Sequence, residues 1–453
     1  MLDCIVVGAG FTGLAAATEL RRLGKSVLVV EARDRVGGRV ENMVLPDGQV
    51  IELGGQWIAP SHERVHALVD SFHLQQLPAS PGRALMRMEG NVVELPVGAE
   101  DDAERTPFEV ADLGQGLLRF HRLATRVEDD PMWAQANRAW LGQDLGRWLH
   151  ANLRTPGGRT DFEHVLRAVN VESRATLRDG LDRVNQGVDL ERLVTINDRV
   201  RQTRVRGGIW TLAERLATEL GDALRTGAPV TGLVQDAEQV IVVLADGEQL
   251  RARRVLLTLP PWLAQQLSYD PELPSWREEV VHRTTPGSVV KAFAIYDHPW
   301  WRERGWSGQM SADEGAVRVS FDTTDPGCSR GVLMGFFEGS EAETASHLSV
   351  SLRRRLFLES LGAVFGPQAA EALDYVDRDW VTDPYSQGCH GAHFAPGLWR
   401  VNGQLLAEPF GRIHFAGAEY SGEFNGYIEG ALLSAEEAAS TIARAGMPDR
   451  RLA

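Results

Sequence analysis

The chain has 453 residues, of which 43% are hydrophobic and 24% charged, and a net charge of −15. Its length provides for two or three domains, and its composition is that of a soluble globular protein, which excludes disordered and fibrous classes. The negative charge disfavours non-specific binding to nucleic acid or to an anionic membrane, so neither partner is expected.

Three cysteines, Cys4, Cys328 and Cys389, lie far apart in the sequence. An odd and scattered set argues against a disulfide framework and for a reducing compartment, so we expect a cytoplasmic protein. The first residues lack the basic start of a secretory signal. No apolar run approaches the roughly 18–20 residues that span a membrane, so no span is expected.

The first predicted element is a βαβ unit over residues 3–31, in which a buried strand, a glycine turn, an amphipathic helix and a second buried strand follow one another. Residues 126–153 and a polar stretch around 160–200 predict a helical region inserted between sheet segments, so residues 104–200 are predicted to form a different domain. Strand-like apolar runs return further along, at 239–261, 288–296 and 316–321. A helix at 351–366 and a final strand, glycine turn and helix over 411–446 complete the pattern, and the lack of Gly/Ser or Pro linkers indicates interleaved domains.

Gly8, Gly10 and Gly13 form a G-x-G-x-x-G turn between the first strand and the first helix. Glycine permits the tight turn, the close approach of backbone to a pyrophosphate and the close packing of helix on strand, and the helix N-terminus attracts phosphate. Glu31 ends the second strand, where a carboxylate can accept hydrogen bonds from both hydroxyls of an adenosine ribose. These residues predict a dinucleotide site for FAD or NAD.

A second region rich in glycine and arginine follows at once, in EARDRVGGR (31–39) and ELGG (52–55). Arg39 is a candidate charge-assisted donor to a phosphate, and Gly54 and Gly55 would let the backbone approach a flat ring. These two stretches resemble the flavin-dependent amine oxidase family, and the resemblance extends over nearly the whole chain.

The resemblance implies an α/β fold with two domains: a Rossmann-like FAD-binding domain of the glutathione-reductase and amine-oxidase type, interleaved with a substrate domain of mixed sheet and helices. The FAD-binding domain is expected at 1–75, 205–280 and 381–446, and the substrate domain at 76–204 and 281–380. A second helix end that faces an anion, after HFAGAEY, fits FAD better than NAD. The further cofactor contacts that the resemblance implies are Arg33, Gly38, Gln56, Trp57, Val230, Trp380, Gly417, Glu419 and Ile428.

Lys291 lies inside the apolar run SVVKAFAIY. Burying a lysine in a sheet is unfavourable unless the amine has a partner or its pKa falls. The position therefore indicates function, unless strand alternation places the side chain on a solvent face. In the family the matching lysine binds a water near flavin N5, which implies a role in flavin reoxidation.

Cys389 lies in YSQGCHGAHFAPG. On residue chemistry alone, the thiol is either an inert buried side chain or a nucleophile activated by His390; a metal site would need more ligands than Cys389, His390 and His393, so no metal is expected. YSQGCH resembles the YSGGCY of mammalian monoamine oxidases, whose cysteine is joined by a thioether to the flavin 8α-methyl group. The resemblance implies this covalent bond at Cys389, with an unlinked cysteine beside the ring as the alternative.

Two positions near the expected flavin face are implied to steer the substrate. Tyr427 matches one of two tyrosines that form an aromatic cage in the vertebrate enzymes, whereas His390 stands at the other. The cage would then be half aromatic and half titratable, or His390 would simply bind backbone. Lys291, Tyr427 and His390 are the expected catalytic residues.

The expected reaction is oxidative deamination: an amine gives an imine, which is hydrolysed to an aldehyde or ketone, while dioxygen is reduced to hydrogen peroxide. The alternatives are an FAD-dependent carbon–carbon desaturase similar to protoporphyrinogen oxidase, and a flavin-binding interaction protein without catalysis. Whether the amine is a monoamine, a diamine or polyamine, a cyclic amine or an amino acid stays open, as does assembly into a homodimer.

Overall fold

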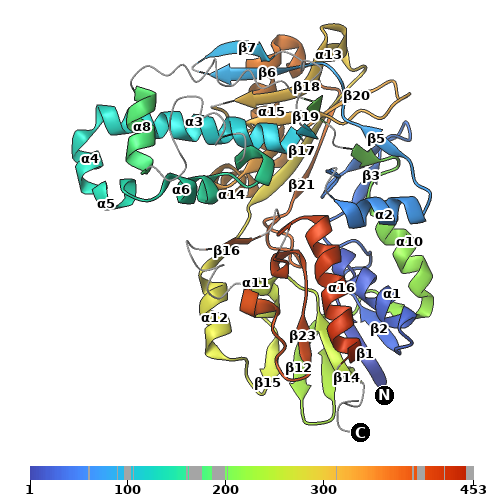
Figure 1. Cartoon of the computed structure of the whole chain (residues 1–453). Coiled ribbons are helices and arrows are strands. Elements are labelled where there is room, and N and C mark those ends of the chain that lie inside the picture. Colours follow the sequence, from blue (N-terminus) through green and yellow to red (C-terminus); the bar gives the residue numbers. More distant parts are fainter. Residues whose placement is uncertain are drawn as a thin grey trace.

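The computed structural model describes residues 1–59, 62–88, 90–95, 104–105, 107–159, 162, 176–185, 199–200, 203–312, 314–389, 392–394, 404–422 and 424–444. Figure 1 shows two lobes, each built around one large sheet, with a group of helices extending to one side of the upper lobe. The expected mixed α/β, two-domain architecture is confirmed.

The lower lobe is built on an eight-stranded sheet of order β11-β2-β1-β14-β13-β12-β15, in which β23 also pairs with β14. Its strands are β1 (Leu2–Val7), β2 (Val27–Val30), β11 (Leu224–Arg225), β12 (Val230–Gln235), β13 (Val240–Leu244), β14 (Gln249–Leu257), β15 (Ser268–Asp270) and β23 (Ile413–Phe415). The β1 strand runs parallel to β2 and β14, and α1 (Phe11–Arg22) joins β1 to β2. The predicted βαβ unit is therefore confirmed.

Both faces of the lower sheet are buried, which explains the nearly continuous apolar runs in its strands. Alternate side chains of β1 enter two cores. Cys4 and Val6 pack in the core formed with α1, α10 (Trp210–Leu220) and α16 (Ile428–Arg444), whereas Ile5 and Val7 pack on the opposite side. The last helix of the chain thus lies beside the first.

The upper lobe is built on a seven-stranded sheet of order β21-β17-β20-β19-β18-β6-β7. Its strands are β6 (Arg83–Met88), β7 (Asn91–Leu95), β17 (Val289–Tyr296), β18 (Trp306–Ala312), β19 (Val319–Asp322), β20 (Gly331–Glu338) and β21 (Asp374–Asp379). The strand predicted at 316–321 begins only at Val319, because the Val317 N–H donates to Ser360 Oγ (3.2 Å) instead of joining the ladder.

Strand β17 is buried along its whole length, because a hydrophobic core packs on each of its two faces. Ala292 and Ala294 pack in the core that includes residues of α15 (Val350–Phe365), while Phe293 and Ile295 pack in the core that contains Trp57, Trp380 and Cys389. Lys291 is two residues before Phe293 on the same strand, so its side chain lies on the same face of the sheet. Lys291 is 2% exposed. The possibility that alternation places Lys291 on a solvent face is thereby excluded.

The helices beside the upper sheet are α3 (Pro107–Asp129), α4 (Pro131–Ala136), α5 (Arg138–Leu141), α6 (Leu145–Asn152) and α8 (Leu177–Asn185). They share one core, in which Phe120, Trp148 and Phe162 make edge-to-face and tilted ring contacts at 5.2–6.2 Å. These helices confirm the helical region predicted at 126–153 and part of the one predicted around 160–200. The described ends of 104–200 are instead two short strands, Glu104–Arg105 and Arg199–Val200.

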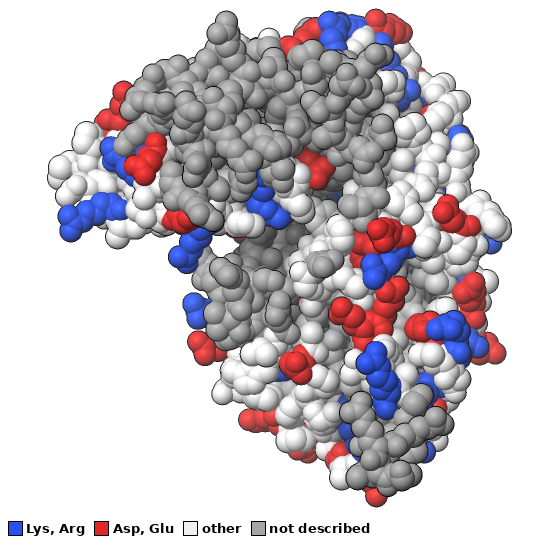
Figure 2. Space-filling view, viewed as in Figure 1, with Lys and Arg blue, Asp and Glu red and all other residues white. Residues whose placement is uncertain are grey.

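Shorter elements connect the sheets and cover their ends. The strands are β3 (Asn42–Val44), β4 (Val50–Glu52), β5 (Gln76–Pro78), β8 (Glu104–Arg105), β9 (Arg199–Val200), β10 (Thr203–Val205), β16 (Thr284–Pro286) and β22 (Ala392–Phe394). The helices are α2 (Glu63–Ser71), α11 (Pro261–Ala264), α12 (Ser275–His282), α13 (Trp300–Glu303) and α14 (Ser340–Ser346). Among the described residues, none of the helices has both the length and the apolar run needed to cross a bilayer. Acidic and basic side chains are interspersed over the lower lobe on the face drawn in Figure 2.

Candidate active site

The glycine turn after β1 needs glycine because of its backbone conformation and its close packing. Gly8 has φ +103°, and a Cβ on Gly13 would lie 1.9 Å from the Gly8 carbonyl oxygen. The Cβ position of Gly10 is different, because its nearest neighbour is the Cα of Gly38 at 4.0 Å. Gly10 also begins α1 without a side-chain cap, so the first N–H groups of the helix remain available to an anion.

Glu31 lies where the glycine turn meets the end of β2. One carboxylate oxygen accepts a hydrogen bond from the Ala9 N–H (2.7 Å), and the other from the Arg33 N–H (2.9 Å). The Ala228 N–H donates to the Glu31 carbonyl (2.8 Å), which brings the segment before Val230 to the same place. Three predicted cofactor contacts, Glu31, Arg33 and Val230, are therefore neighbours.

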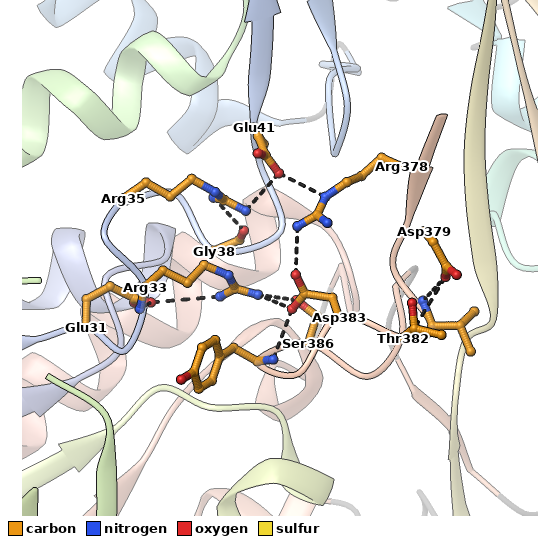
Figure 3. Close-up of polar contacts among 12 residues, drawn as sticks. Glu31, Arg33, Arg35, Gly38, Glu41, Arg378, Asp379, Thr382, Asp383 and Ser386 are labelled. Carbon is orange, nitrogen blue, oxygen red and sulfur yellow. Dashed lines mark hydrogen bonds and ion pairs between the residues drawn. The ribbon is translucent and has the colours of Figure 1, made fainter. Parts of the chain in front are cut away.

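A network of charges ties this region to the loop that precedes Cys389 (Figure 3). Arg33 pairs with Asp383, and Arg378 donates to both Asp383 (2.7 Å) and Glu41 (3.0 Å). Arg35 also donates to Glu41 (2.9 Å). Burial alone would raise the pKa of Asp383, but the charges of Arg33 and Arg378 outweigh burial and lower it. Arg33, predicted as a cofactor contact, thus has a carboxylate partner within the chain.

Arg39 and Glu419, which are far apart in sequence, form a bidentate ion pair with N···O distances of 2.5 and 3.0 Å. The Gly417 N–H donates to Ser434 Oγ (3.1 Å), which fixes the turn from β23 toward α16. The structure therefore joins the arginine-rich loop to the C-terminal turn.

Lys291 extends from β17 to the segment that follows β4. Its Nζ donates to the carbonyl oxygens of Glu52 and Gly54 (2.8 Å to Gly54) and to Gln56 Oε1. Burial lowers the pKa of Lys291 to about 7, against the opposing effect of the Glu52 and Cys389 charges. The predicted catalytic lysine and the predicted Gly54 and Gln56 are thus in direct contact.

Glycine at 54 is required by the chain itself, because a Cβ there would lie 2.0 Å from the Arg39 carbonyl oxygen. Gly55 is less restricted, and its nearest neighbour is Ile428 Cδ1 at 3.5 Å from the Cβ position. Ile428 and Gly55, both predicted as cofactor contacts, therefore face one another. The expectation that a flat ring lies against this segment stays a prediction.

Cys389 is held by its backbone at the edge of the core below β17. Its N–H donates to the Gly287 carbonyl (2.7 Å), and the Gly388 N–H donates to the Trp380 carbonyl (2.8 Å). The Trp380 indole donates to the Leu53 carbonyl (2.9 Å). Both Cys389 and Trp380 are buried, so the two predicted residues lie in one core beside Lys291.

Four aromatic rings form a wall on the same side of β17, and we call Trp57, Phe108, Phe321 and Phe336 the aromatic wall. The Trp57 ring lies 5.8 Å from Phe321 and 6.3 Å from Phe108, and Phe108 lies 6.1 Å from Phe336. Lys291 Nζ lies 5.8 Å from the Phe336 ring. Apart from Trp57, sequence reasoning missed this wall.

Tyr427 lies immediately before α16, and its ring contacts His62 in an edge-to-face arrangement at 5.6 Å. Burial raises the pKa of Tyr427 to about 12, with further contributions from Asp112 and Glu109 of α3. The lower-lobe tyrosine therefore faces the helical part of the upper lobe. His390, the third predicted catalytic residue, lies outside the described residues.

One signal in the sequence could have singled out Lys291 without any resemblance. The chain contains only two lysines, Lys25 and Lys291, against 45 arginines. An arginine cannot lose its proton in a protein, whereas a lysine can. Nearly every other cation is arginine, so the single buried lysine is conspicuous. Asp383 and the aromatic wall have no comparable signal, because their partners come from distant segments.

The described residues fit a bound flavin dinucleotide. The open side of Gly10 and the uncapped start of α1 suit phosphate, and the buried Glu31 suits ribose. The Nε2 atom of Gln56 and the Nε1 atom of Trp57 are buried without a protein hydrogen-bond partner, as expected of donors that serve a ligand or water. The residues present therefore offer donors to a phosphate, an acceptor to a ribose, and two further buried donors to the cofactor or to water.

Comparison with known proteins agrees with this geometry. Residues 11–443 match the family model for flavin containing amine oxidoreductases. The chain is 33% identical to a putative flavin-containing monoamine oxidase of Mycobacterium tuberculosis, over 98% of this chain and 96% of the relative. It is 30% identical to an L-amino acid dehydrogenase of Synechocystis, over 97% of this chain and 94% of the relative. Among solved structures, putrescine oxidase bound to putrescine is similar with a TM-score of 0.75 and 28% sequence identity. Cyclohexylamine oxidase of Brevibacterium oxydans is similar with a TM-score of 0.74 and 29% sequence identity. Each comparison covers 98% of this chain and 99% of the chain of the solved structure. The chain is a flavin-containing amine oxidase and belongs to the flavin-containing amine oxidoreductase family.

Proposed function

We propose that this protein catalyses FAD-dependent oxidative deamination of an amine, with dioxygen as electron acceptor. The observation that carries the proposal is the buried Lys291, held by Glu52, Gly54 and Gln56 next to Trp380 and Cys389. When bound, FAD would supply the hydride acceptor for the carbon next to the amine nitrogen and would pass the electrons to dioxygen; water would hydrolyse the resulting imine to a carbonyl.

The protein's own residues orient the amine and exclude water from it. The aromatic wall and Tyr427 offer ring faces to the substrate, and such faces attract an ammonium group during entry. His390 is proposed to complete the cage with Tyr427. Lys291 is proposed to assist reoxidation of the reduced cofactor.

The proposed division of the chain follows the two sheets. The FAD-binding domain comprises 1–75, 205–280 and 381–446, and the substrate domain 76–204 and 281–380, because strands of the lower and upper sheets fall in these segments respectively. Strand β16, from the second substrate segment, pairs with β22 from the last FAD segment. A cytoplasmic location and a homodimeric assembly stay predictions.

The reaction is tested with an amine panel. Purified protein is given monoamines, diamines, polyamines, cyclic amines and amino acids, and hydrogen peroxide, ammonia and oxygen uptake are measured together. We expect amine-dependent peroxide with matching oxygen consumption. A second candidate, oxidation of an amino acid with another electron acceptor, is supported by the relative described as an L-amino acid dehydrogenase. Reduction of a dye acceptor by amino acids without oxygen uptake would favour that candidate and contradict the first.

We further propose that Cys389 carries FAD through an 8α-S-cysteinyl bond. Its formation removes one hydrogen from the thiol and one from the 8α-methyl group; the two electrons would reduce the flavin, and dioxygen would reoxidise it. The buried thiol, in the same core as Trp380 and Lys291, supports this proposal. After precipitation in acid, the yellow colour and the flavin mass should remain with the protein, and Cys389→Ala should release them. Cys328→Ala, at the half-buried cysteine, is the matched control and should retain the bound flavin. Release of all flavin from the wild type would show an unlinked cysteine beside the ring.

A further inference from the structure

The ammonium group of Lys291 faces three acceptors and no carboxylate directly. Its Nζ donates to two carbonyl oxygens, of Glu52 and Gly54, and to the amide oxygen of Gln56. A protonated lysine has three donors, whereas a neutral lysine has two donors and a lone pair. The geometry therefore suits the charged form, although burial in a sheet opposes that form. A charged Lys291 requires an opposite charge nearby.

Glu52 is the carboxylate placed to supply that charge. It is 3% exposed, and its Oε1 accepts a hydrogen bond from the Ile209 N–H (2.7 Å). Arg204 Nη1 lies 3.7 Å from Glu52 Oε2, and Arg204 Nη2 lies 3.4 Å from Asp325 Oδ1. The Glu52 carboxylate is thus held by the Ile209 N–H and by an arginine that Asp325 partly neutralises.

The cluster also contains buried polar atoms that have no hydrogen-bond partner in the protein. These atoms are Glu52 Oε2, Gln56 Nε2 and Arg204 Nε. Buried polar atoms are normally satisfied, and ordered water serves where protein does not. Water bound among these atoms would connect the Glu52 carboxylate with the Gln56 amide that accepts from Lys291.

We propose that Glu52 is a positioning residue that keeps a proton on Lys291 in the buried site, with Arg204 holding the carboxylate in place. The other charged groups that face the amine are consistent with this assignment. Cys389 favours the ammonium only as a thiolate, and Arg204 opposes it. Arg378, opposite Lys291 in the β17–β21 pair, is itself paired with Glu41 and Asp383. The inference rests on the proposed function only where it gives the Lys291 proton a role in the reaction. The effect of the Glu52 carboxylate on protonation of Lys291 is a property of the resting protein.

The low lysine content makes a direct measurement feasible. Lysine labelled with ¹⁵N in the flavin-loaded protein gives two Nζ signals, and Lys25→Arg assigns them. In the wild type we expect an ammonium signal for Lys291 at pH 6 that disappears as the pH rises. Glu52→Gln should lower the midpoint of this titration by about 1–3 pH units, the usual effect of removing a nearby opposite charge.

Two further variants separate charge from structure. Glu52→Asp keeps the carboxylate and should titrate near the wild type. Glu429→Gln is the matched control: Glu429 is equally buried, but its carboxylate accepts from Arg64 and Val65, so the Lys291 midpoint should not move. A midpoint in Glu52→Gln within about 0.3 unit of the wild type, or a neutral Lys291 at pH 6, would overturn the proposal. These titrations need no amine, so a wild type that oxidises none of the panel contradicts the proposed function and leaves this inference standing.

Discussion

Lys291→Met is expected to slow reoxidation of the reduced enzyme by dioxygen about ten- to a hundredfold, while reduction by amine changes by less than about threefold. The physical reason is that methionine fills a similar volume but removes a positive charge from a dry site, where a placed charge acts most strongly. Stopped-flow absorbance of the flavin, with the two half-reactions followed separately, measures both rates.

The chain offers a closely matched control for this substitution. Lys25→Met changes the only other lysine, which follows α1 in the lower lobe and is half-buried. Both half-reactions should keep their wild-type rates in this variant. If Lys291→Met slowed the two half-reactions equally, the role of Lys291 in reoxidation would be wrong.

Gly13→Ala is expected to destabilise the lower lobe by about 3 kcal/mol or more, because the added Cβ would lie 1.9 Å from a backbone oxygen that cannot move aside cheaply. The first helix would be pushed away from β1, and the phosphate-facing turn would open with it. We expect weak flavin retention and a fall in Tm of at least about 6 °C, measured by thermal unfolding and by the flavin-to-protein ratio.

Gly362→Ala gives the comparison without the clash. Gly362 lies inside α15, and a Cβ there would meet no atom within 4 Å. Alanine favours a helix over glycine, so this variant should be as stable as the wild type or slightly more stable. An unchanged Tm in Gly13→Ala would contradict the packing role assigned to that glycine.

The local features of the lower lobe were predictable because each depends on residues that are close in sequence. The turn of Gly8, Gly10 and Gly13 requires glycine for backbone reasons, and the strand, helix and acid follow in order. The apolar residues on both sides of Lys291 indicated a buried strand, and the structure then showed that the Lys291 side chain takes a buried face of the sheet. These predictions needed only interactions between residues that are close in sequence.

The long-range partners were not predictable in this way. Sequence alone suggested Arg33 and Arg39 as cofactor contacts, but the structure gives each a carboxylate partner more than 300 residues away, Asp383 and Glu419. Likewise, the aromatic wall takes one ring each from α3, β19 and β20 and one from the segment after β4. Only the fold decides which of many similar side chains meet.

The position of the last helix has a consequence for the way this protein is made. Strand β23 and helix α16 come from the end of the chain, yet β23 pairs with β14 and α16 packs against α1. During synthesis, the amino-terminal glycine turn therefore leaves the ribosome long before the helix that covers it. The lower lobe is completed only after all strands of the upper sheet have been synthesised. Until then, its apolar surface needs other protection from aggregation.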